Sequence, residues 1–81
     1  MNINLSHVGL DLVSGGKDGY IYKRRGTNKY IAVLRPDYDG NAAALFVKKG
    51  IHPFVFNGKN FIDLLNGEVV PYPWMIMKEV A

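Results

Sequence analysis

The densest group of residues able to do chemistry in this sequence is a run of cations and tyrosines between positions 20 and 30. These residues are Tyr20, Tyr22, Lys23, Arg24, Arg25, Lys29 and Tyr30. Ammonium and guanidinium groups attract carboxylates and phosphates. A tyrosine ring can stack on a base or fill a pocket in a protein. The sequence therefore predicts a partner-binding site here. The alternative interpretation is a charged edge that only prevents aggregation between strands.

Two classes of partner fit this site. Arginine and tyrosine are the residues that dominate protein interfaces, and the same pair can hold phosphates while stacking on bases. The net charge of +3 is modest, and acidic residues are interspersed along the chain. No RNA-binding signature such as the paired RNP motifs is present. We therefore favour a larger protein as the partner of an inhibitor or adaptor, with nucleic-acid binding as the alternative.

Candidates for catalysis or metal binding are few. His7 and His52 are the only histidines; neither lies in a metal-ligand spacing, and we interpret both as surface or turn residues. Residues 16–18 lack the Ser or Thr that a phosphate-binding loop needs after its lysine. The acids at 37–40 do not fit the spacing of a calcium loop, and no serine lies in a G-x-S-x-G motif. We expect no enzyme, no cofactor and no metal.

The totals indicate a single domain over residues 1–81. Zero cysteines exclude disulfides and thiolate zinc sites, which suits a reducing cytoplasm. The N-terminus does not resemble a secretory signal, and no apolar run reaches the ~20 residues that a membrane span needs. Because the chain begins with Met1 and is short, we expect a complete small cytoplasmic protein with no membrane partner. A viral or mobile-element protein would suit this profile.

A β-hairpin over residues 19–35 is the element that must position the candidate site. Its arms are rich in β-branched and aromatic residues, and residues 25–29 between them contain Gly and Asn, which tolerate turn conformations. With an odd loop length Tyr20 and Tyr22 would share a face with Tyr30, and with an even one they would lie with Ile31 and Val33. The sequence leaves that choice open.

Four further strands are expected. The first covers residues 2–13, with a change of apolar parity that indicates a bulge near Ser6 and His7. The second is the apolar run of residues 42–49, which Gly50 ends. Residues 54–56 and 74–80 are the third and fourth.

Residues 57–67 have two interpretations. Asn57-Gly58 is a strong hairpin signal. Alternatively, residues 61–66 form a short helix with an apolar stripe and a glycine cap at Gly67, and we favour this helix. The expected fold is α+β and mostly β, with a twisted antiparallel sheet or partly open barrel of five to six short strands and one short helix. The expected core comprises Phe46, Phe54, Leu64 and Ile76.

Overall fold

The computed structural model describes residues 4–6 and 9–72. Within these residues the chain forms six strands and one helix. The strands are β1 (Leu10–Gly15), β2 (Gly19–Arg24), β3 (Tyr30–Leu34), β4 (Ile51–Phe56), β5 (Phe61–Asp63) and β6 (Val69–Val70), and the helix between β3 and β4 is α1 (Gly40–Lys48).

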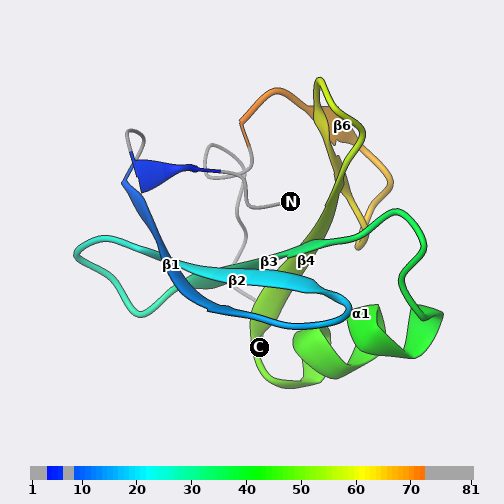
Figure 1. Cartoon of the computed structure of the whole chain (residues 1–81), viewed down its shortest axis with the longest axis horizontal. Coiled ribbons are helices and arrows are strands. Elements are labelled where there is room, and N and C mark those ends of the chain that lie inside the picture. Colours follow the sequence, from blue (N-terminus) through cyan, green and yellow to red (C-terminus); the bar gives the residue numbers. More distant parts are fainter. Residues whose placement is uncertain (1–3, 7–8, 73–81) are drawn as a thin grey trace.

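The strands form one open sheet in the order β1-β2-β3-β4-β5-β6. Figure 1 shows α1 below the central strands and β6 above them. The prediction of a mostly β, α+β domain with one short helix is confirmed. The sheet is mixed rather than antiparallel throughout, because α1 returns the chain so that β4 runs parallel to β3.

The strand predicted over residues 42–49 is wrong, since this segment forms α1. The side chain of Asp39 accepts a hydrogen bond from the Asn41 N–H at 3.0 Å and so caps the helix. Three consecutive alanines then favour helix, and Gly50 ends it with a φ of +78°. The apolar run at 45–47 is also typical of a buried strand, which is why the prediction was wrong. On the helix, Leu45 of this run is half exposed.

The helix predicted over residues 61–66 is also wrong. Residues 61–63 form β5, and the Asn57-Gly58 hairpin interpretation is the one observed: the Asn57 N–H donates to the Asn60 carbonyl at 3.1 Å. A single helical turn follows β5, closed by the Gly67 N–H on the Asp63 carbonyl at 2.7 Å. The apolar stripe therefore marks one turn between strands, too short to persist as a helix.

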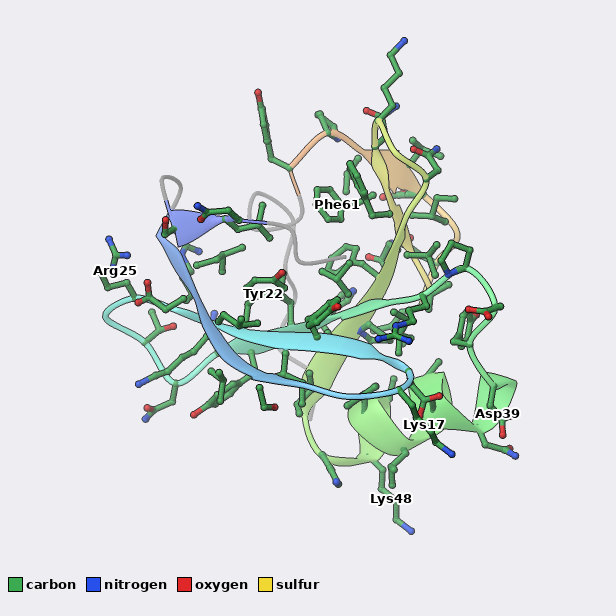
Figure 2. The ribbon with its side chains drawn as sticks, in the orientation of Figure 1. Lys17, Tyr22, Arg25, Asp39, Lys48 and Phe61 are labelled. Atoms are coloured by element: carbon green, nitrogen blue, oxygen red, sulfur yellow. The ribbon has the colours of Figure 1, made fainter. Side chains whose placement is uncertain are left out.

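The register of the β2–β3 hairpin resolves which tyrosines face the core. Tyr20 pairs with Val33 and Tyr22 pairs with Ile31, as an even loop length requires. Tyr22 is consequently only 1% exposed. Figure 2 shows its ring directed from the sheet toward Phe61.

The core lies on the face of the sheet that carries Tyr22. Its buried residues come from every strand and from the segment before β1: Leu5, Leu10, Tyr22, Ile31, Val33, Phe54, Phe61 and Val70. Phe54 is fully buried, as predicted, and its ring meets the edge of Phe61 at 6.4 Å. Phe46 and Leu64 are only half-buried, contrary to the prediction. Ile76 lies outside the described residues.

The N-terminal strand is shorter than predicted and begins at Leu10. Leu5 is buried, and its carbonyl accepts the Leu10 N–H at 3.2 Å across a turn. That turn produces the change in apolar parity, while the register shift of β1 lies between Leu12 and Ser14. His7 and the strand expected over 74–80 lie outside the described residues. Within the described ranges, no helix is long and apolar enough to cross a membrane.

Candidate partner-binding site

The β2–β3 turn is a compact loop organised by Thr27. The Thr27 hydroxyl donates to the Arg24 carbonyl at 2.9 Å and accepts the Lys29 N–H at 3.1 Å. Gly26 supplies the turn with a φ of +78°, which side chains other than glycine rarely adopt. The turn therefore has a defined shape, and the exposed side chains of Arg24 and Lys29 extend from it.

Arg25 fastens this turn to the start of β1. Its Nη2 and Nε lie 2.6 and 3.2 Å from the two carboxylate oxygens of Asp11. Its backbone N–H donates to the Gly9 carbonyl at 2.7 Å. The hydrogen bond from Arg25 holds the pKa of Asp11 below its ordinary value; desolvation opposes this effect, and the charges of Arg25 and Lys23 add to it. Asp11 thus offsets one of the positive charges at the turn.

The structure brings five of the seven sequence-predicted site residues to this end of the hairpin: Lys23, Arg24, Arg25, Lys29 and Tyr30. Tyr22 is in the core and presents no surface to a partner. Tyr20 lies four residues from Arg24 along β2, which corresponds to about 13 Å in a strand. Tyr30 is therefore the tyrosine of the predicted set that remains beside the cations, and it is half-buried.

Two further lysines lie at the C-terminal end of α1, and neither belongs to the site expected from the sequence. Lys48 is in the last turn of α1 and Lys49 follows it, just before Ile51, which pairs with Tyr30 across β3 and β4. In Figure 2 the Lys48 side chain extends below α1, well away from Arg25. We therefore give the name basic end to the four cations of the turn alone: Lys23, Arg24, Arg25 and Lys29.

Three of the described carboxylates lie at the other end of β3. Asp18 precedes β2 next to the end of β3, and Asp37 and Asp39 lie in the loop that leaves it. In Figure 2, Arg25 and Asp39 lie at opposite margins of the molecule, and Lys48 extends below α1. At the basic end the described carboxylate is Asp11. The charge of the described residues is thus unevenly distributed.

A second polar pair lies inside the core. His52 and Asp63 are 3% and 1% exposed, with Nε2 of His52 2.9 Å from Oδ1 of Asp63. Neither ring nitrogen of His52 has a hydrogen-bond partner among the described residues. The interpretation of His52 as a surface or turn residue is therefore wrong. Its position in β4, facing the core, buries it, and its ring stacks on Phe54 at 4.7 Å.

The basic end can attract and orient an anionic surface, because Arg24, Arg25 and Lys29 are exposed and Thr27 holds the turn in shape. The described part of the chain contains no group of three His, Cys, Asp or Glu residues that could hold a metal ion. The comparisons with known proteins found no match to this chain among family models, curated proteins or solved structures.

Proposed function

We propose that this protein is a non-enzymatic binding protein of the cytoplasm that docks on an acidic surface of a larger protein through its basic end. The proposal is carried by the gathering of four cations at the β2–β3 turn, against one neighbouring carboxylate among the described residues. Such a charge distribution accelerates encounter with an acidic partner and selects its orientation. Binding of this kind would suit an inhibitor or adaptor.

The position of the tyrosines supports a protein partner over a nucleic acid. Binding of single strands combines cations with several aromatic rings on which successive bases stack. Here Tyr22 is buried, Tyr20 lies near the far end of β2, and only Tyr30 of the predicted tyrosines remains at the basic end. The Asp11 carboxylate also lies among the cations, where it would repel phosphates but could accept a donor from a protein partner.

The test compares two double variants that remove the same charge from opposite ends. The immobilised protein is first exposed to a nuclease-treated lysate, and the captured protein is identified and purified. Arg24→Ala/Lys29→Ala should weaken its binding by about tenfold or more, because interface cations at a hot spot each contribute roughly 1 kcal/mol or more. The loss should shrink as salt rises, since screening acts over about 10 Å at 0.1 M.

Lys17→Ala/Lys59→Ala is the matched control, because both lysines are exposed and lie outside the basic end. This control should retain binding, and both double variants should keep the wild-type melting temperature. Equal losses of binding in the two double variants would show that net charge, rather than the basic end, carries the interaction. Tighter binding to a fluorescent oligonucleotide than to the captured protein would overturn the proposal in favour of a nucleic-acid partner.

A further inference from the structure

A cavity of about 490 Å³ opens between the loop after β3 and the β4–β5 turn, away from the basic end. Because β3 and β4 are parallel, their carboxyl ends lie together and the chain leaves them in different directions. Crevices at the carboxyl ends of parallel strands are common ligand sites, and this volume lies within the usual range of about 300–1,000 Å³ for small-molecule pockets.

The cavity walls are mostly apolar. Val33 belongs to the core, and the partly buried rings of Tyr20 and Phe56 pack against that core. Pro36 lines the side formed by the loop after β3, and its ring contributes no backbone donor. Flat apolar walls of this kind favour a ligand with a planar hydrophobic body.

One cation lies among these apolar residues. The Arg35 guanidinium carbon lies 6.0 Å from the centroid of the Tyr20 ring, and the Arg35 N–H donates to the Asp18 carbonyl at 2.8 Å, which fixes the backbone at the end of β3. No carboxylate of the described residues lies within ion-pair distance of Arg35. Its charge is therefore available to an anion placed in the cavity.

Asn57 completes the polar part of the lining. Its side-chain oxygen accepts the N–H groups of Lys59 and Asn60 at 2.9 and 2.7 Å, so this part of the wall is held in place by its own turn. The cavity is thus bordered by two turns whose backbones are hydrogen-bonded. We propose that it binds a small molecule with a flat aromatic body and one carboxylate, the body against Tyr20 and Phe56 and the carboxylate on Arg35.

The test uses two probes of the same shape, naphthalene-2-carboxylate and naphthalene-2-carboxamide, titrated into ¹⁵N-labelled full-length protein. The carboxylate should shift the amide resonances of residues 33–35 and 57–58 in a saturable manner. It should bind more tightly than the carboxamide. In Arg35→Gln that preference should fall by about two- to fivefold, the range that an exposed ion pair supplies, with carboxamide binding unchanged.

Lys59→Gln is the control, because it removes a neighbouring cation that does not line the cavity. It should keep the wild-type preference, and unperturbed resonances elsewhere will show that both variants are folded. The proposal is overturned if the shifts map to the basic end, if the two probes bind equally to the wild type, or if no saturable shift occurs at millimolar concentration. The result is independent of the proposed function, since that function concerns the opposite end of β3.

Discussion

Two aspartates in this small domain make close contacts with a basic side chain in opposite surroundings. Asp11 on the edge strand β1 meets Arg25 at 2.6 Å, with both side chains at least half exposed. Asp63 on β5 meets His52 at 2.9 Å, with both side chains almost fully buried. The two distances are similar, so the difference between the pairs lies in their access to water.

Access to water decides what each pair does. An exposed pair is screened and adds little to stability, so the main effect of Asp11 is on the charge and shape of the basic end. A buried pair has lost its hydration, so removing one partner leaves the other without compensation. Asp63 also accepts the Leu65 N–H at 2.8 Å, which ties the pair to the β5–β6 turn. We therefore expect Asp63 to act on folding and Asp11 on binding.

The largest effect is expected from Asp63→Ala. It removes the acceptor for the Leu65 N–H and leaves His52 buried beside a small void, which should lower the free energy of unfolding by about 2–4 kcal/mol. Asp63→Asn should cost less, because an amide oxygen can still accept that N–H. Urea denaturation measures both. If Asp63→Ala were as stable as the wild type, the buried pair would contribute no more to stability than the exposed pair.

A smaller effect is expected from Gly67→Val in the turn that follows Asp63. Gly67 has a φ of +77°, and its N–H donates to the Asp63 carbonyl. Beyond its two chain neighbours, no heavy atom of the described residues lies within 4 Å of the position that a Cβ would take, so the cost is backbone strain rather than a clash. The variant should lose about 1–2 kcal/mol. Thermal unfolding checks this value, and Gly67→Asn, which tolerates positive φ, should lose less.

The smallest effect on stability is expected from Asp11→Asn. The pKa of Asp11 is lowered in the folded protein, so its contribution exists above the ordinary carboxyl pKa of 3.8 and is lost as the pH falls through the lower folded value. Because the pair is exposed, the melting temperature at pH 7 should hardly change, and the variant should differ from the wild type only in losing this acid dependence below pH 3.8. A melting curve measured from pH 7 down to pH 2 tests both statements.

The same substitution also tests the effect of Asp11 on binding. Asp11→Asn raises the positive charge of the basic end, so it should tighten binding to the acidic partner at low salt and have little effect at high salt. Binding that weakened at every salt concentration would show that Asp11 contacts the partner directly, as an acceptor.

Local patterns predicted the parts of this fold whose hydrogen bonds are local. The β2–β3 hairpin followed from alternating apolar residues around a glycine-containing loop, and residues 54–56 were correctly expected to form a strand. Two apolar segments were assigned to the wrong kind of element. Residues 42–49 were predicted to be a strand and form a helix, and residues 61–63 were predicted to be helical and form a strand. Short apolar runs suit both states, and here the Asp39 cap and the alanines decided the first of them.

The four cations of the turn are close together in sequence, so a local pattern identified them. The surroundings of the tyrosines and of His52 depended on contacts that no local pattern contains. The register of the hairpin buried Tyr22 and placed Tyr20 in the wall of the cavity. The pairing of His52 with Asp63 likewise needs the β4–β5 register.

The parallel pairing of β3 with β4 has a consequence for how the chain reaches this structure. Every other strand pair joins consecutive strands through a turn, so β1–β3 and β4–β6 are two units of local contacts. Tyr30 must find Ile51 across roughly 20 residues, and α1 must form within that span. The entropic cost of closing this loop therefore arises in a single step, the pairing of β3 with β4. We therefore expect the docking of these two units to limit the folding rate, and substitutions along the β3–β4 pairing to change that rate.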